Sequence, residues 1–165
     1  MRRLRFTLVA LLTLVGSAPS LMAQRAPPRK LAASLERVYG PGVRADTVPI
    51  DPEVTLRIYR GDSLLGFAQV GNVKGKDQPI TFLVATDTAL RLKDIDILVY
   101  REPYGGEVAY EQWRRQFRGT RPGDSLEVDR QIRGISGATI SVHAVTAAVR
   151  HSLENLAAWH KDGRL

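Results

Sequence analysis

The chain has 165 residues and no cysteine, which excludes disulfide bonds, thiolate metal sites and iron–sulfur clusters. Its formal net charge is +7, and removing residues 1–23 subtracts three arginines and no acid, which leaves +4. This excess is mild, and the basic residues are not expected to share an exposed face with aromatic residues in a pattern that suits nucleic acid, which argues against nucleic-acid binding.

The first 23 residues have the composition of a secretory signal peptide. Three arginines precede an apolar stretch at residues 6–15, and small residues then lead to Ala23. The apolar stretch is shorter than the roughly 20 residues that span a bilayer. We therefore expect cleavage after Ala23 and export to the periplasm or another extracytoplasmic space, with an uncleaved N-terminal membrane anchor as the alternative.

Residues 24–49 are predicted to be a linker that leads into a short helix. Residues 24–29 contain adjacent prolines and are expected to be extended. Three apolar residues then recur at helical spacing over residues 30–38. The Gly-Pro-Gly sequence at residues 40–42 is expected to end this helix.

Residues 50–162 are predicted to form one α+β domain, an antiparallel sheet of about four or more strands packed with helices. Short apolar runs separated by turn residues predict the strands. Their hairpin-length connections favour antiparallel pairing. The expected strands are residues 54–59, 64–73, 80–86 and 95–100.

An aromatic stripe predicts a helix over residues 107–118. Tyr110, Trp113 and Phe117 recur at i, i+3 and i+7. We interpret this stripe as core rather than as a surface on which a cofactor stacks. The basic residues of the same region are expected to form one exposed face, either simply solvated or a docking patch for an acidic partner or lipid headgroups. They are Arg114, Arg115, Arg118 and Arg121.

Four apolar residues recur at helical steps and predict a long helix from Thr139 onward, packed on the sheet. They are Val145, Val149, Leu153 and Leu156. The histidines of this region, His143, His151 and His160, lie eight and nine residues apart. That spacing does not match the i, i+4 geometry of a helical metal site, so we assign them to the helix surface. We predict neither a metal site nor a catalytic residue.

The run Gly-Ile-Ser-Gly-Ala-Thr-Ile-Ser at residues 134–141 places small residues and hydroxyl groups at the entrance of this helix. Gly and Ala let a ligand approach the backbone closely. The unpaired N–H groups and the dipole of a helix N-terminus favour an anion such as a phosphate. The same residues are also typical of a helix cap, in which a Ser or Thr oxygen accepts a first-turn N–H.

Residues 136–141, Ser-Gly-Ala-Thr-Ile-Ser, resemble the flavinylation motif of the FMN-binding domain family. That family includes subunits of the sodium-pumping NADH:quinone reductase and of the related Rnf electron-transport complex. Residues 95–108 are similar to the family's strand followed by an acidic loop that contains Pro and Gly. With Trp113 and Phe117 between these two segments, the resemblance extends over residues 50–160.

The resemblance implies FMN as the cofactor. In the family, a flavin transferase moves FMN from FAD onto the last residue of Ser-Gly-Ala-Thr as a phosphodiester, which here is Thr139. The loop that contains Glu102 lies near the flavin in the family, although an ordinary surface turn is the other interpretation of this loop. The cofactor-binding residues expected on this basis are Thr139, Ser136, Gly137, Ala138, Ile140, Ser141, Glu102 and Tyr104.

The resemblance therefore implies an extracytoplasmic electron-transfer protein whose partners are the flavin transferase and an unidentified membrane or periplasmic redox protein. A carrier is favoured over a stand-alone enzyme because the chain has no nicotinamide-binding fingerprint. One position departs from the family's pattern: Arg133 stands three positions before Ser136, where an acid is usual, and the nearest acid is Asp129. This departure keeps open a second function, a module of the same fold that binds FMN non-covalently or has lost it.

Overall fold

An antiparallel sheet with helices on both faces makes up the part of the chain that the structure describes. The structure is a computed structural model, and it describes residues 28–50 and 53–165. The predicted signal peptide and residues 24–27 of the predicted linker lie outside these residues. The elements in chain order are α1 (Pro28–Tyr39), β1 (Arg44–Val48), β2 (Val54–Arg60), β3 (Ser63–Lys74), β4 (Pro79–Asp87), β5 (Leu92–Val99), the 3-10 helix η2 (Gly106–Ala109), α2 (Glu111–Arg114), the 3-10 helix η3 (Arg115–Phe117) and α3 (Thr139–Lys161).

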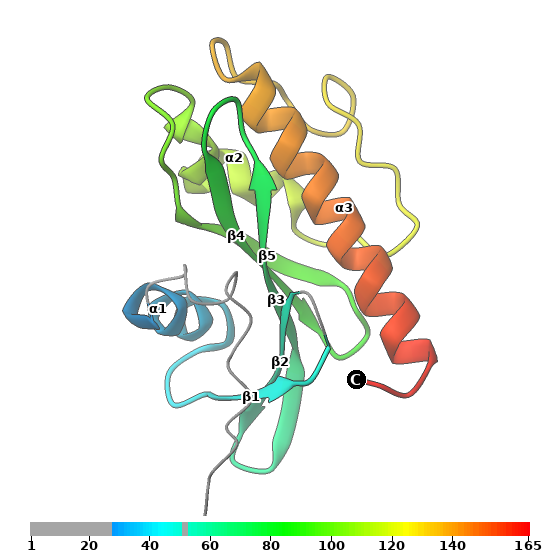
Figure 1. Cartoon of the computed structure of the whole chain (residues 1–165). Helices are drawn as coiled ribbons and strands as arrows, with labels where there is room; N and C mark the ends of the chain where they lie inside the picture. Colours follow the sequence, from blue (N-terminus) through cyan, green and yellow to red (C-terminus); the bar gives the residue numbers. More distant parts are fainter. Residues whose placement is uncertain (1–27, 51–52) are drawn as a thin grey trace, which may run out of the picture.

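The five strands lie in the sheet in the order of the sequence, each antiparallel to the next. α1 lies against one face of the sheet, and α3 crosses the other (Figure 1). This arrangement confirms the α+β prediction. The four predicted strands are β2 to β5, each within a few residues of its expected ends.

β1 was not predicted, because its sequence carries almost no alternating apolar signal. Of its five residues, only Val48 is buried. β1 pairs with β2 at the edge of the sheet, where one flank of the strand has no neighbour among the described residues. Backbone pairing rather than side-chain burial therefore accounts for this strand.

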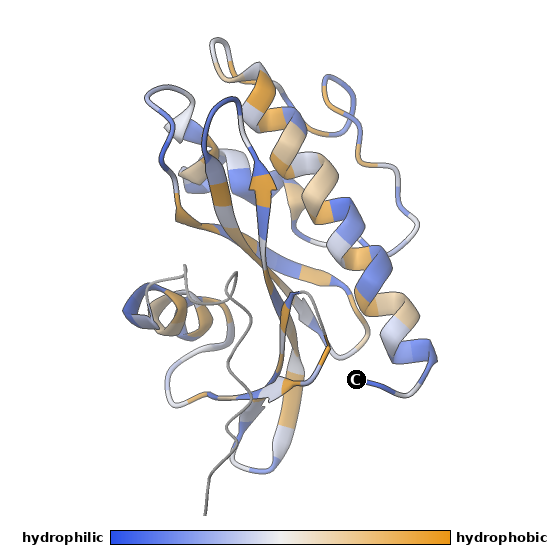
Figure 2. Ribbon diagram, viewed as in Figure 1, coloured by the Kyte–Doolittle hydropathy of each residue, from blue (hydrophilic) through white to orange (hydrophobic). Residues whose placement is uncertain are grey.

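Alternating side chains on the central strands supply two separate hydrophobic cores. Val84 and Ile95 pack in the core beneath α3, whereas Leu83 and Ala85 pack in the core beneath α1. Figure 2 shows apolar residues along the strands between the two helices. Because successive side chains point to opposite faces, β4 is buried on both sides, and its apolar run is nearly continuous.

α1 begins at Pro28, earlier than predicted, so residues 28–29 are helical rather than part of an extended linker. Proline is well tolerated in the first turn of a helix, where its missing N–H would have no partner. Leu35 and Tyr39 of α1 are buried against the sheet. The Tyr39 hydroxyl donates a hydrogen bond to a backbone carbonyl of β3 or β4, since it lies 2.7 Å from the Phe67 oxygen and 2.8 Å from the Thr86 oxygen.

The continuous helix predicted over residues 107–118 is wrong. The segment consists of the short pieces η2, α2 and η3, and Tyr110 between η2 and α2 has an extended backbone with φ −72° and ψ 137°. Trp113 and Phe117 are buried and make an edge-to-face contact, with ring centroids 5.0 Å apart. Tyr110 instead is 64% exposed, so the predicted aromatic core stripe contains two residues rather than three.

α3 is the predicted long C-terminal helix, and it begins at Thr139 as expected. Its buried residues include the four apolar ones that predicted it. All three histidines are exposed on its surface, as assigned. No helix in residues 28–50 and 53–165 combines the length and the hydropathy needed to cross a bilayer.

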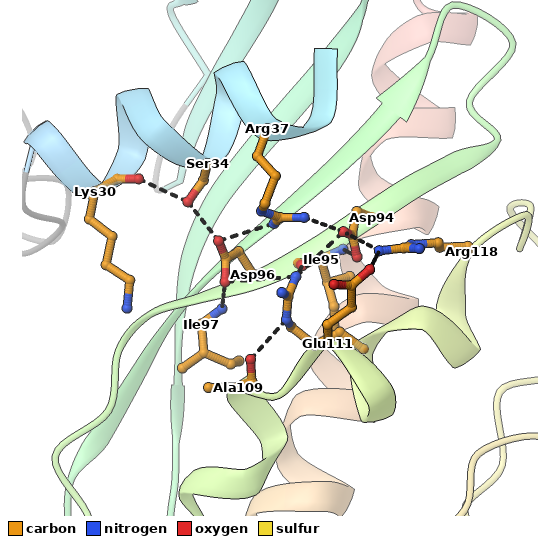
Figure 3. Close-up of polar contacts among 11 residues, drawn as sticks. Lys30, Ser34, Arg37, Asp94, Ile95, Asp96, Ile97, Ala109, Glu111 and Arg118 are labelled. Carbon is orange, nitrogen blue, oxygen red and sulfur yellow. Dashed lines mark hydrogen bonds and ion pairs between the residues drawn. The ribbon is translucent and has the colours of Figure 1, made fainter. Parts of the chain in front are cut away.

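A buried ion network fastens α1 and η3 to the edge strand β5 (Figure 3). Asp94 of β5 is 3% exposed, and its Oδ2 accepts hydrogen bonds from Arg37 at 2.5 Å and from Arg118 at 3.1 Å. Ser34 and Arg37 of α1 also donate to Oδ2 of Asp96, at 2.7 and 3.1 Å.

Arg114 of α2 completes this network. Its burial shows that the prediction of Arg114 on an exposed basic face is wrong. Arg114 is 7% exposed, and its guanidinium donates to the carbonyl oxygens of Ile95 and Ala109 at 2.5 and 2.9 Å. It also lies 3.4 Å from Oδ2 of Asp94. Burial opposes the ionisation of Asp94, but hydrogen bonds and charges from the three arginines outweigh it and hold the pKa of Asp94 below its usual value.

Candidate functional site

A cavity of about 340 Å³ lies between the start of α3 and the loop that follows β5. It brings together two segments more than 30 residues apart that were expected to meet at a cofactor. Lys76, Asp77 and Pro103 also line it. The predicted site residues that line it are Glu102, Tyr104, Gly137, Ala138, Thr139, Ile140 and Ser141.

The backbone at the entrance of α3 is open toward this cavity. Gly137 has a left-handed backbone with φ +79°, and Ala138, the residue at the N-cap position, has no side chain that can cap the helix. The predicted Ser or Thr cap is therefore wrong. The first-turn N–H groups keep no side-chain acceptor, which leaves them available to an anion.

Thr139 and Ser141, the two hydroxyl residues of this helix turn, have different surroundings. Thr139 is exposed, and its hydroxyl has no hydrogen-bond partner among the described residues. Ser141 is 5% exposed, and its Oγ lies 2.9 Å from the hydroxyl oxygen of Tyr100. Thr139 is thus the hydroxyl that an external reactant can reach, whereas Ser141 is engaged within the fold.

Tyr100 ties the loop after β5 to the start of α3, and the sequence did not identify it as a site residue. Its hydroxyl donates to the backbone oxygen of Tyr104 at 2.5 Å and meets Ser141 from the other side. Gly105 makes this approach possible, because a Cβ at that position would lie 2.7 Å from the Tyr100 hydroxyl and 3.1 Å from Cβ of Ala138. Gly105 also has φ +87°, a conformation that side chains disfavour.

Glu102 ties the same loop to the turn between β3 and β4. Its Oε1 accepts hydrogen bonds from the backbone N–H groups of Asp77 at 2.7 Å and Gln78 at 3.0 Å. The N–H of Gln78, followed by those of Asp77 and Lys76, holds the pKa of Glu102 below its usual value, although partial desolvation opposes this effect. Oε1 of Glu102 therefore holds the loop after β5 against the turn between β3 and β4. Contact between Glu102 and a flavin ring stays a prediction.

Two exposed apolar side chains border the cavity. Tyr104 is 81% exposed, and Ile140 is 50% exposed. Among the described residues, large hydrophobic side chains with this much exposure are few. A flat aromatic ligand in the cavity would cover apolar surface on both residues, which is favourable.

A second cavity of about 270 Å³ lies on the other side of Thr139. Ser136, the remaining predicted site residue, lines this cavity together with Asp129 and His143. The Asp129 carboxylate lies close to Gly134, since a Cβ at Gly134 would be 2.9 Å from its Oδ1. Asp129, the acid nearest to Ser136 in the sequence, is therefore also close in space to the start of the segment 134–141.

Arg133, the residue that departs from the family's pattern, lines neither of the two cavities beside Thr139. Its backbone is held by the neighbouring helical segment: the Trp113 indole N–H donates to its carbonyl at 2.9 Å, and its N–H donates to Oε1 of Gln116 at 2.8 Å. Arg133 lines a third cavity, beside Tyr110. The Arg at this position thus does not place a positive charge in either cavity that the Thr139 side chain lines.

The model of the FMN-binding domain family matches residues 75–154. This part of the chain, from the end of β3 through most of α3, belongs to the FMN-binding domain family. Both Glu102 and Thr139 lie within the match. A search of curated proteins found none that matches the chain. The match starts after β2 and most of β3, although both strands are hydrogen-bonded into the same sheet.

The residues present fit FMN. The phosphate fits the uncapped N-terminus of α3, where Gly137 has open space beside its backbone. The ring fits the cavity bordered by the exposed side chains of Tyr104 and Ile140. Lys76 adds one positive charge to the wall of the same cavity, but Asp77 and Glu102 also line it, so the helix N-terminus rather than the lining side chains supplies the attraction for the phosphate.

Proposed function

We propose that this protein is an extracytoplasmic electron carrier whose FMN is joined through its phosphate to Thr139. The observation that carries the proposal is the exposed Thr139 hydroxyl at the uncapped start of α3, in a cavity shared with the loop of Glu102 and Tyr104. Bound FMN supplies one- and two-electron chemistry, and the protein supplies position and electrostatics.

In the attachment step, the Thr139 hydroxyl oxygen forms a bond to the FMN phosphorus of FAD. The bond from that phosphorus to the oxygen of the AMP moiety breaks, AMP leaves, and the hydroxyl proton is released. No oxidation or reduction occurs, and FAD is the co-reactant. The flavin transferase that delivers it needs access to Thr139, and the exposure of this side chain supports such access.

The N-terminus of α3 favours the phosphodiester that results. A negative charge at this position gains about 0.3–1 kcal/mol from the helix dipole when exposed, and up to ~2 kcal/mol when partly buried. Carboxylates line both cavities beside Thr139, Asp129 in the second and Asp77 and Glu102 in the first, so the attraction for the phosphodiester comes from the helix N-terminus, and the exposed Tyr104 and Ile140 favour placing the flavin in the first cavity. The ring then lies against Tyr104 and Ile140.

The leader-like residues 1–23 support export, and the covalent link suits that location. Free flavin is dilute outside the cell, and a cofactor held by a covalent bond is not lost by dilution, whereas a reversibly bound one is. The partners are the flavin transferase and a membrane or periplasmic redox protein. Cell fractionation should find the flavin-bearing protein outside the cytoplasm, and an N-terminal sequence that begins at Gln24 would support cleavage after Ala23.

The attachment is tested by producing the protein with a flavin transferase and denaturing it in acid. Flavin fluorescence should stay with the polypeptide in the parent protein and in Ser136→Ala, and should leave it in Thr139→Ala. Ser136→Ala is the matched control, because it removes a neighbouring exposed hydroxyl from the same segment. Flavin retained on Thr139→Ala would contradict the assignment.

A second candidate function is a module that binds FMN reversibly. Arg133, which replaces the acid usual in the family's motif, is the observation that favours it. In that case the protein produced with the transferase would release its flavin in acid, and free FMN would rebind after refolding.

A further inference from the structure

A third cavity, of about 490 Å³, lies beside the segment 134–141, and the proposed function assigns no ligand to it. It is lined from one side by α2 and η3 and from the other by Arg133 and Ile135. Its volume falls within the range of about 300–1,000 Å³ that small-molecule sites occupy. The third cavity shares Ile135 with the second cavity, but it does not include Thr139.

Hydrogen bonds across its base hold the two walls of the third cavity together. The Trp113 indole N–H donates to the Arg133 carbonyl at 2.9 Å. Gln116 accepts from the Arg133 N–H through its Oε1 at 2.8 Å and donates through its Nε2 to the Trp113 carbonyl at 3.1 Å. The third cavity is therefore formed before any ligand arrives, and a ligand does not have to order its walls.

The charges that line the third cavity leave a positive excess. Arg115 and Arg133 line it, and neither guanidinium has an ion-pair partner among the described residues. Glu107 is the opposing carboxylate on the wall. By contrast, the neighbouring Arg118 is neutralised by Asp94 and Glu111. Two unpaired guanidinium groups can bind a planar anion such as a carboxylate through parallel hydrogen bonds.

Aromatic and apolar groups line the same cavity. Tyr110 is 64% exposed on its rim, where the break between η2 and α2 turns the ring away from the core. Ile135 is partly exposed, and the buried Trp113 forms part of the wall. A ligand that pairs a flat ring with one negative charge would satisfy both the rings and the guanidinium groups.

We propose that the third cavity binds a small aromatic anion, held by Arg115 and Arg133 and stacked against Tyr110. The proposal does not rest on flavin attachment, because none of these residues lines a cavity with Thr139. Binding therefore occurs in both the flavin-free and the flavin-bearing protein.

Nuclear magnetic resonance tests this with 2-naphthoate as the probe and 2-naphthamide as its neutral counterpart. The chain has two tryptophans, Trp113 in the third cavity and Trp159 near the far end of α3. The Trp113 indole N–H signal should shift with 2-naphthoate and saturate with a Kd of about 1 mM, as the usual affinity per ligand atom gives for a molecule of this size. The Trp159 signal should not move.

Arg133→Gln should weaken binding of 2-naphthoate about tenfold, because a charge-assisted hydrogen bond is lost. Arg150→Gln, an exposed arginine on α3 that lines none of the three cavities, is the matched control and should bind like the parent. The dispersion of the amide signals in the same spectra shows that each variant is folded. The absence of a Trp113 shift at several Kd, an equal shift with 2-naphthamide, or unchanged affinity in Arg133→Gln would overturn the proposal.

Discussion

Replacing Asp94 by Asn should strongly destabilise the protein, because it removes the central negative charge of the network in Figure 3. The amide side chain is isosteric with the carboxylate but uncharged, so the main loss is electrostatic. Of the three arginines at Asp94, Arg37 and Arg118 have side chains that are 37% and 41% exposed, and water can screen their charges. The Arg114 side chain is only 8% exposed and cannot be resolvated without moving.

Breaking a buried ion pair by removing one partner costs about 3–5 kcal/mol. Asp96 remains 3.8 Å from Arg114 and compensates part of that charge, so we expect the low end, about 3 kcal/mol. Urea denaturation at neutral pH measures the loss. The control is Asp46→Asn, whose partner Arg44 is exposed, and it should cost less than about 1 kcal/mol. Equal and small losses in both variants would refute the reasoning.

The pKa of Asp94 adds a pH test with a definite sign. Because the folded-state pKa lies below the unfolded value of about 3.9, the carboxylate contributes stability above that pH and loses it as the pH falls through the folded-state value. The stability gap between the parent protein and Asp94→Asn should therefore narrow below about pH 4. A gap that stays constant down to about pH 2 would contradict the assigned pKa direction.

Two further substitutions test how the loop after β5 is held against α3. Tyr100→Phe should lower the free energy of unfolding by about 1–2 kcal/mol and speed amide exchange at residues 101–106, because it removes both hydrogen bonds of the hydroxyl. The control, Tyr59→Phe on β2, should change the free energy of unfolding by less than about 0.5 kcal/mol. In urea denaturation, Gly105→Ala should destabilise the protein more than Gly163→Ala. Both glycines have a positive φ, at which a residue with a side chain costs about 1–2 kcal/mol. Only at Gly105 would the added Cβ also lie against other atoms. Equal losses at the two glycines would mean that the loop does not need this close approach.

The sheet and the last helix could be predicted from the sequence because their apolar periodicity is local. β1 could not, since backbone pairing with β2 forms it and only Val48 is buried. The broken segment around Tyr110 satisfies the helical spacing of Trp113 and Phe117 without being one helix. Spacing predicts which residues share a face, but it does not exclude an extended residue between two short turns.

The site was predictable only as two separate segments. The sequence pointed to the residues around Glu102 and Thr139, and the cavity between them depends on how α3 crosses the sheet. Tyr100 was missed because a hydroxyl at the end of a strand gives no local sign of its partner 41 residues away. The sequence did not predict the buried network of Asp94 and Asp96, because charges that alternate with isoleucine suggest a strand with one solvated face. In the structure, α1 and Arg114 cover that face of β5.

The central claim is that Thr139 carries the flavin, and peptide mapping of the protein produced with a flavin transferase tests it most directly. Trypsin cleaves after Arg133 and Arg150, so the peptide of residues 134–150 contains Thr139 together with three other hydroxyl residues, Ser136, Ser141 and Thr146. The account predicts that this peptide gains the mass of FMN less one water, and that fragmentation places the gain on Thr139. The same gain on Ser136 or Ser141, or an unmodified peptide from protein that was exposed to active transferase, would contradict it.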